Sequence, residues 1–587
     1  MFRTLMIGAV SALTLSAAAF AQRRFGVIIA CAALASIFAG LPISTVEAQS
    51  GVVGHGQTGP GKRIPFKAQR ERPQLTPEQM RLQEERLRRH KDTHGDPALP
   101  EAPASQTPAG APTASPLQVR PGPTEVLPIG GTFTIFQQTA QTQPGTSFDA
   151  ETQAATNGPI VFYSGNLFAS FSTDGGASFT FVNPFTQFPT LDGGLCCDQT
   201  VIYDPTRDLM IWQLQYAQSP STNKGSYRTA FAPPASVPSA GWCVYEWNPG
   251  DFGFPSGRSL DRPEVALSSN FVWYSANIYT EPDAKFERSV MWRIRLDPPV
   301  TCDSRAFEFF LGVPAQFHFT PVQGATDTMY WANLQTFPTA DSIRIYQWAE
   351  ADSTPSSTDV AISLWPNARP RLCPGPDVLN WCRAADKRQA SGWIANGVIG
   401  FMWSASQGTG ALGDFPFPYV HVARFNASTT PTLIDEPIIW NSGGAWIYPN
   451  VGVNDRGAIA GTLSFGGGVY FPYLTALILD DLTTAAPPPW EIYGFTSSTG
   501  AGDDRWGDYY SSRRNGFNGN TWVISGQAVN AGVREAWYVW MGRSRDAPLT
   551  EMTSPGVQGT SPTSASSDYL RFWWEDISRQ RPPARSP

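Results

Sequence analysis

Charged and phenolic side chains recur a short distance before the aromatic segments of this chain, and their types suit ligand binding or acid–base chemistry. The set comprises Asp149, Glu151, Asp198, Asp261, Arg262, Glu264, His318, Arg388, Tyr448, Asn450, Asp504, Arg505, Asp508 and Tyr509. Carboxylates can transfer protons, and arginines can bind anionic groups through two parallel hydrogen bonds. If the fold gathers these residues in a concave site, mixed charge predicts a ligand-binding site. The alternative is that they cap strand ends and bridge neighbouring sheets.

A repeated segment predicts the elements that would position these residues. From about residue 131, a strand, a turn rich in Gly, Asn and Asp, and a second strand ending in four bulky residues recur. These tetrads are Val161–Ser164, Met210–Gln213, Val272–Ser275, Met329–Ala332 and Phe401–Ser404, with weaker copies at Ile459–Thr462 and Thr521–Ile524. They begin 49 (210 − 161) to 72 (401 − 329) residues apart. This period is typical of blades of four short strands.

We therefore predict an all-β fold with a single large β-propeller over residues 131–543, seven blades being favoured and six possible. Such a ring needs its two ends to meet, and Thr132–Phe136 and Ala536–Trp540 are the candidate strands for the closing blade. Because the innermost strands of a propeller all begin at one face, the polar residues named above are expected to converge near the axis. The 20 Trp and 18 Tyr are accounted for by stacking between blades.

Between Phe168 and Phe181 the chain has the features of a tight hairpin. Gly175 and Gly176 can supply the positive φ that such turns need, and the Asp174 carboxylate can accept hydrogen bonds from turn N–H groups. With Ser172 and Phe179, this stretch resembles the Asp-box, also called the BNR repeat, of sialidases and related β-propellers. An ordinary Asp-Gly hairpin is the alternative.

The resemblance to sialidases implies roles for six residues. That family binds a substrate carboxylate with three arginines, uses a Tyr–Glu pair as nucleophile and an Asp as acid/base. Carried over, the arginines are Arg262, Arg388 and Arg505, the nucleophile is Tyr509 or Tyr510, its partner is Glu264 and the proton donor is Asp198.

The chain also departs from the sialidase pattern. The family's first arginine lies in an Arg-Ile-Pro motif of the first blade, whereas Arg63-Ile64-Pro65 falls here in a segment predicted to be disordered. No arginine replaces it in the first repeat, and only one good Asp-box copy is present. We therefore favour an exported, non-catalytic propeller that binds a glycan or an extracytoplasmic protein, with a sialidase-like glycoside hydrolase as the alternative.

Residues 503–510 resemble a Trp-Gly-Asp-Tyr stretch in the last blade of bacterial sialidase-like propellers of unassigned activity. Asp503, Asp504 and Asp508 could hold a structural Ca²⁺ through oxygen ligands. An ion pair with Arg505 is the simpler interpretation. The sequence indicates no other cofactor, and with only 5 His a histidine-based metal site is not expected.

Six of the seven cysteines follow residues 1–48, which have the features of an export signal. An even number of cysteines favours disulfides in an exported chain. Cys373 and Cys382 flank a Pro-Gly-Pro loop and form the preferred pair, and Cys243 with Cys302 is plausible. The adjacent Cys196 and Cys197 are expected to pair with different partners. A bond between these two, seen over the cofactor of some quinone-dependent dehydrogenases, is the alternative.

The flanks of the predicted propeller differ from it in composition. Residues 1–48 contain two consecutive signal-like segments, which predicts export to the periplasm or outside the cell. Residues 49–130 are rich in Pro and charge and predict a disordered tether with one helix near 77–91. Residues 544–587 form a Ser- and Pro-rich tail with an aromatic patch. The net charge of −7 excludes nucleic acid as an expected partner, and we expect a monomer without a membrane span after the leader.

Overall fold

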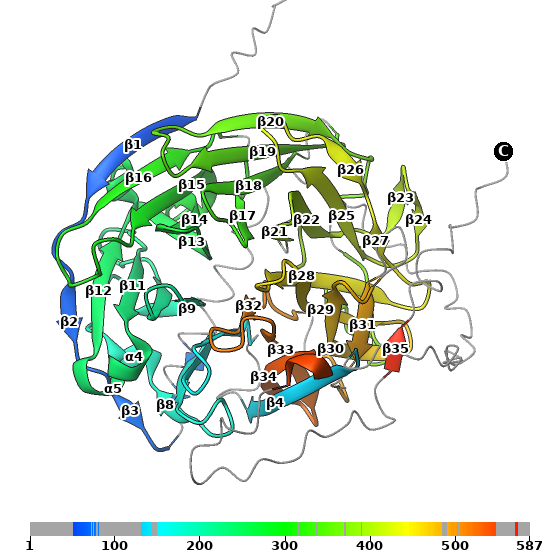
Figure 1. Ribbon diagram of the computed structural model, residues 1–587, viewed down its shortest axis with the longest axis horizontal. Coiled ribbons are helices and arrows are strands. Elements are labelled where there is room, and N and C mark those ends of the chain that lie inside the picture. The colour runs from blue at the N-terminus through cyan, green and yellow to red at the C-terminus, as the bar shows by residue number, and fades with distance from the viewer. Residues whose placement is uncertain are drawn as a thin grey trace, which may run out of the picture. The chain divides into compact units, whose positions relative to one another are not determined.

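The strands of this protein pair into sheets that follow one another around a common centre (Figure 1). The computed structural model describes residues 51–71, 73, 76–77, 80–81, 131–142, 150–314, 316–335, 339–368, 371–388, 390–483, 490–494, 496, 498–502, 505–547 and 570–572. Nearly all regular structure in these ranges is β, as the sequence predicts. The helical turns are short: α4 (Pro184–Gln187), α5 (Val237–Ala240), η1 (Pro234–Ser236), η2 (Pro249–Phe252) and η3 (Ser544–Asp546).

Three sheets come first in the chain, and each is an antiparallel meander. The first contains β5 (Gln153–Thr156), β6 (Val161–Gly165), β7 (Phe168–Ser172) and β8 (Thr180–Val182). The second contains β9 (Leu195–Asp204), β10 (Leu209–Tyr216), β11 (Tyr227–Ala232) and β12 (Trp242–Trp247). The third contains β13 (Arg258–Leu267), β14 (Phe271–Thr280), β15 (Lys285–Arg295) and β16 (Ala306–Leu311).

A nine-stranded sheet follows, made of two meanders joined by a parallel pairing of Val322 with Gly392. Its first half is β17 (Thr320–Gln323), β18 (Thr328–Gln335), β19 (Ser342–Ala349) and β20 (Ser356–Ala361). Its second half is β21 (Ala390–Ala395), β22 (Val398–Ala405), β25 (Tyr419–Asn426), β26 (Leu433–Asp435) and β27 (Ile438–Ile439). Between β22 and β25 lies a small hairpin of β23 (Gly408–Gly410) and β24 (Gly413–Phe415).

The last two sheets bring the end of the chain back to its beginning. One contains β28 (Ala445–Val453), β29 (Ile459–Gly467), β30 (Tyr470–Leu479) and β31 (Glu491–Gly494), and β35 (Leu570–Phe572) pairs with β31. The other contains β32 (Ser512–Arg514), β33 (Trp522–Asn530), β34 (Val533–Arg543) and β4 (Phe133–Thr142). The pairing of β4 with β34 confirms the predicted closing strands.

The inner strands contact one another in a closed cycle. β5 contacts β9, and the contacts then run through β13, β17, β21, β28 and β32 back to β5. Each of these strands pairs with a strand that carries one of the sequence tetrads, or, for Thr521–Ile524, all but its first residue. The repeat read from the sequence therefore corresponds to the structural repeat.

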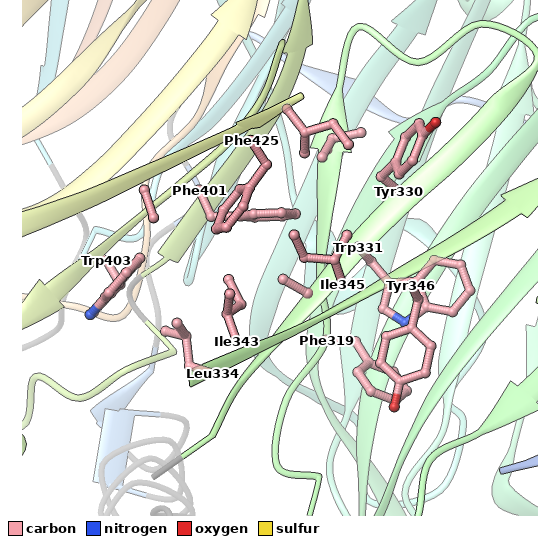
Figure 2. Packing of buried hydrophobic residues seen from close by; sticks show 14 of the residues in the cluster. Phe319, Tyr330, Trp331, Leu334, Ile343, Ile345, Tyr346, Phe401, Trp403 and Phe425 are labelled. Carbon is pink, nitrogen blue, oxygen red and sulfur yellow. The ribbon is translucent and has the colours of Figure 1, made fainter. Parts of the chain in front are cut away.

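Aromatic side chains pack both between neighbouring sheets and within them. Trp273 of β14 contacts Trp348 of β19 in the next sheet, with ring centroids 5.5 Å apart. Trp331 of β18 stacks on Tyr346 of β19 with ring centroids 5.0 Å apart, and both pack near Phe319 (Figure 2). Phe401 and Trp403 of β22 belong to the same buried cluster, so it spans both halves of the nine-stranded sheet. Such burial explains the high aromatic content without a ligand.

The predicted tether is wrong for residues 51–69. Here β1 (Val52–Gln57), β2 (Lys62–Ile64) and β3 (Ala68–Gln69) add outer strands to the third, second and first sheets, respectively. Gly54 and Gly56 lie opposite Phe309 and Phe307, and a Cβ at either glycine would fall 2.1 to 2.3 Å from the facing ring. Glycine is therefore what lets β1 cover these rings. Of the predicted helix near 77–91, only Pro77, Met80 and Arg81 lie within the described residues, and these are helical.

Candidate functional site

A repeated backbone irregularity occurs at or just before the first half of four inner strands. Glu151, Arg262, His318 and Tyr448 all have positive φ, between 40° and 67°. In each case the residue two positions later pairs with the fourth tetrad residue of the next strand: Gln153 with Ser164, Glu264 with Ser275, Thr320 with Ala332, and Asn450 with Thr462. In β13 and β28 the register shifts at this point, as in a β-bulge. Bulges re-aim side chains and recur next to functional sites.

The structure brings the three predicted arginines into one group of contacts. Arg262 Nη2 donates to the main-chain oxygen of Arg388 at 2.7 Å, and Arg262 Nη1 lies 4.0 Å from Asp508 Oδ2. Arg505 Nη2 donates to the other oxygen of Asp508 at 2.7 Å. We call Asp198, Arg262, Glu264, Arg388, Arg505, Asp508 and Tyr509 the axial cluster.

Each of these arginines forms ion pairs with nearby carboxylates. Arg388 Nη2 lies 2.9 Å from Asp386 Oδ2, and its Nη1 lies 3.8 Å from Asp261 Oδ2. Burial acts to lower the pKa of Arg388, but Asp386 and the other nearby negative charges outweigh it and hold the pKa above its usual value. For Arg262 the same balance between burial and the charges of Glu264 and Asp508 raises the pKa. Arg262 and Arg388 are therefore held in the charged form, and each of the three arginines lies within 4.0 Å of a carboxylate.

Tyr509 packs its ring against a guanidinium group. The Cζ atom of Arg262 lies 4.6 Å from the centre of the Tyr509 ring, within the range of a cation–π contact. Burial raises the pKa of Tyr509 well above its usual value, and the charges of Asp198 and Glu151 add to this effect. A tyrosine nucleophile needs the opposite shift. This environment does not favour the nucleophilic role that the sialidase resemblance implies for Tyr509.

Glu151 and His318 complete the surroundings of the cluster. Glu151 Oε1 accepts the main-chain N–H of Asp508 at 2.9 Å and lies 3.8 Å from Arg505 Nη2. His318 Nε2 lies 3.7 Å from Glu264 Oε1, and burial lowers the pKa of the imidazole. Asp386 was not singled out from the sequence, although its place two residues before Arg388 could have suggested an ion pair.

Several polar atoms in the cluster and on the adjacent His318 lack a hydrogen-bond partner among the described residues. They are Tyr509 Oη, Arg262 Nε and Nη1, and both ring nitrogens of His318. A buried polar group left without a partner costs about 1–3 kcal/mol. Water or a ligand with hydroxyl groups would satisfy these atoms.

The predicted calcium ligands are only partly within the described structure. Asp503 and Asp504 lie outside it, and Asp508 pairs with Arg505 as the simpler interpretation expects. Within the described ranges, no group of three or more His, Cys, Asp or Glu side chains is placed to hold a metal ion.

The disulfides correct one sequence prediction and confirm two. Cys373 pairs with Cys382 and Cys243 with Cys302, with Cα separations of 5.9 and 5.4 Å. Cys196 is bonded to its neighbour Cys197, so the expectation of different partners for these two is wrong. Both lie on β9 directly before Asp198. Successive side chains of an extended strand point to opposite faces, so the strand pattern itself argues against this bond.

The Ser172–Phe179 turn has the hydrogen bonds expected for it. Asp174 Oδ1 accepts from the Ser178 N–H at 2.9 Å, and the Gly176 N–H donates to Ser172 Oγ at 2.9 Å. The φ values of Gly175 and Gly176 are 73° and 92°. This turn joins β7 to β8.

The Arg63-Ile64-Pro65 segment lies away from the axial cluster, because Lys62–Ile64 form the outermost strand of the second sheet.

No helix within the described ranges is long and apolar enough to cross a membrane.

Comparisons with known proteins give only distant likenesses. No protein-family model and no curated protein matches the chain. A protein of unknown function from Dyadobacter fermentans is 9% identical, with a TM-score of 0.35, over 68% of this chain and 99% of that one. An α-L-arabinofuranosidase from Fusarium graminearum is 10% identical, with a TM-score of 0.33, over 69% and 97%. A Trypanosoma rangeli sialidase is 8% identical, with a TM-score of 0.29, over 69% and 59%. Likeness at this level carries no argument about activity.

Proposed function

We propose that this chain is an exported, seven-bladed β-propeller that binds a glycan through the axial cluster. The observation that carries the proposal is the set of buried, unsatisfied polar atoms on Tyr509, Arg262 and His318. Sugars present hydroxyl groups that both donate and accept hydrogen bonds. The closed cycle of inner strands supports the propeller, and the three disulfides are consistent with export.

The exposure of the cluster favours a small ligand over a protein surface. The side chains of Glu264, Arg505 and Asp508 are 20%, 15% and 11% exposed, and that of Arg262 is 1% exposed. A stable protein interface usually buries about 800 Å² on each partner. A few partly buried polar groups suit a sugar ring better.

Binding is tested by calorimetric titration of the folded protein with a panel of oligosaccharides. We expect Tyr509→Phe to weaken binding by about tenfold, as for the loss of a hydrogen bond to a buried group. Tyr419→Phe is the matched control, because the Tyr419 hydroxyl is also buried without a described partner but lies on β25. Equal affinity of Tyr509→Phe and the wild type would contradict the proposal.

Glycoside hydrolysis is the second candidate, because all six residues assigned by the sialidase resemblance lie in or beside the same contact network. The raised pKa of Tyr509 disfavours a sialidase mechanism, although an acid–base pair involving Asp198 and Glu264 remains compatible with these positions. A hydrolase would turn over fluorogenic glycosides and lose that turnover in Asp198→Asn and Arg388→Ala. A binding protein would show no turnover in any of these variants.

A further inference from the structure

In the described part of the chain, two buried histidines each lie beside a glutamate, and they differ in whether a hydrogen bond joins the two side chains. His421 Nε2 lies 3.0 Å from Glu436 Oε1, which is a direct hydrogen bond. His318 Nε2 lies 3.7 Å from Glu264 Oε1, which is beyond hydrogen-bond length. The His318 side chain is 3% exposed, yet neither ring nitrogen has a hydrogen-bond partner within the described residues.

Arg262 meets the same carboxylate oxygen from another direction. Its Nε lies 3.6 Å from Glu264 Oε1 and makes no hydrogen bond to the described residues. Two buried nitrogens therefore face one oxygen, each too far away to bond to it directly. An oxygen atom placed beside this group, rather than between its atoms, could accept a hydrogen bond from one of these nitrogens and donate one to the carboxylate.

The backbone supports a functional reason for this arrangement. His318, two residues before β17, and Arg262, within β13, occupy equivalent positions relative to the next strand, with φ of 67° and 60°. Residues other than glycine are strained in this region of backbone conformation, and such residues cluster at binding and active sites. Glu264 is 20% exposed, so its carboxylate reaches the surface while the two nitrogens stay buried.

The charges around His318, Glu264 and Arg262 determine which kind of ligand oxygen can bind beside them. A ligand carboxylate would face the Glu264 carboxylate, and the nearby Arg388 and Arg505 are already paired with Asp386 and Asp508. A hydroxyl can donate to Glu264 while it accepts from His318 or Arg262. The preference for an uncharged group follows from like-charge repulsion in a poorly solvated site.

We propose that His318, Glu264 and Arg262 form a subsite for a sugar hydroxyl, and that the axial cluster therefore selects neutral glycans over uronic or sialic acids. This inference rests on the proposed glycan-binding function and specifies its ligand class. It assigns the arginines a role other than binding a substrate carboxylate.

The test compares matched neutral and acidic sugars by calorimetry: galactobiose with digalacturonate, and lactose with sialyllactose. We expect the wild type to bind the neutral member of a pair at least about tenfold more tightly than the acidic member. Glu264→Gln should reduce this ratio of neutral to acidic affinity. His318→Leu should weaken neutral binding by about tenfold, as expected for a lost hydrogen bond to a charged network. His318→Gln keeps a donor at a similar position and should recover part of the affinity.

His421→Gln is the matched control, since it alters another histidine–glutamate pair, whose histidine is buried on β25, and should leave sugar affinity unchanged. Thermal melting of each variant shows whether it is folded, and if His318→Leu is not, Glu264→Gln and His318→Gln decide the question. Tighter binding of the acidic sugars would overturn this inference while glycan binding itself stands. Neutral binding that is insensitive to His318 and Glu264 would also overturn it. Failure of every sugar to bind would refute the proposed function as well.

Discussion

Arg543, at the end of β34, joins the last sheet to its neighbour through buried ionic contacts, and its removal tests the closed ring. Its Nε and Nη2 donate to the two oxygens of Asp480 at 2.7 and 2.9 Å, and its Nη1 donates to Glu491 at 2.8 Å. Nη1 also donates to the main-chain oxygen of Gly131, just before β4, at 3.0 Å. Arg543 is 0% exposed.

Replacing Arg543 with Met would leave two carboxylates buried without their cation. Removing one partner of a buried ion pair costs about 3–5 kcal/mol in the free energy of unfolding. With an unfolding entropy of about 2.1 cal/mol/K per residue over the roughly 420 residues that the structure describes, a loss of about 4 kcal/mol lowers Tm by about 4–5 °C. Calorimetry and urea unfolding would measure the two quantities.

The control is Arg344→Met, which breaks an exposed pair of similar geometry. Arg344 contacts Asp359 through two bonds of 2.6 Å, but the two side chains are 28% and 50% exposed. Exposed pairs contribute about 0–1 kcal/mol. If Arg543→Met cost no more than Arg344→Met, the view that this buried network secures the ring would be wrong.

Three further predictions concern the outer strand, a disulfide and pH. Gly54→Val should displace β1 from the Phe309 ring, because its Cβ would fall 2.1 Å from that ring, and limited proteolysis should then cleave near residue 54. Replacing Cys243 and Cys302 with Ala should lower the free energy of unfolding by about 4 kcal/mol, given 59 residues of separation, as measured in urea. Burial lowers the pKa of His421, so between that value and about 6.5 the unfolded chain binds more protons and stability falls as pH drops. Thermal melting from pH 7.5 to 5 should therefore show a steeper loss in the wild type than in His421→Gln.

Each of these has an outcome that contradicts it. Unchanged proteolysis of Gly54→Val would mean that β1 tolerates a side chain against the ring. If the variant with Ala at positions 243 and 302 were as stable as the wild type, the stabilisation assigned to that disulfide would be wrong. Parallel melting curves for the wild type and His421→Gln would show that this histidine does not titrate differently in the two states.

The sequence by itself determined the repeating part of the fold. The bulky tetrads identify the second strand of every sheet in the cycle, because side chains buried between two sheets must be apolar and large whatever their tertiary partners. The charged residues upstream of them were expected to converge, and Arg262, Arg388 and Arg505 do so. This was predictable because inner strands of a cycle all begin at one face. The turn at Asp174 followed from local chemistry alone.

Only the tertiary structure decided the features that depend on distant partners. Residues 51–69 are too polar and too rich in glycine to predict strands. In β1, the glycines Gly54 and Gly56 lie against the rings of Phe309 and Phe307, which a larger residue could not approach. The pairing of Arg388 with Asp386, and the gap of 3.7 Å between His318 and Glu264, depend on where neighbouring strands place their side chains. Differences of less than 1 Å in such positions separate a hydrogen-bonded pair such as His421 and Glu436 from a pair without that bond, and no pattern along the chain encodes them.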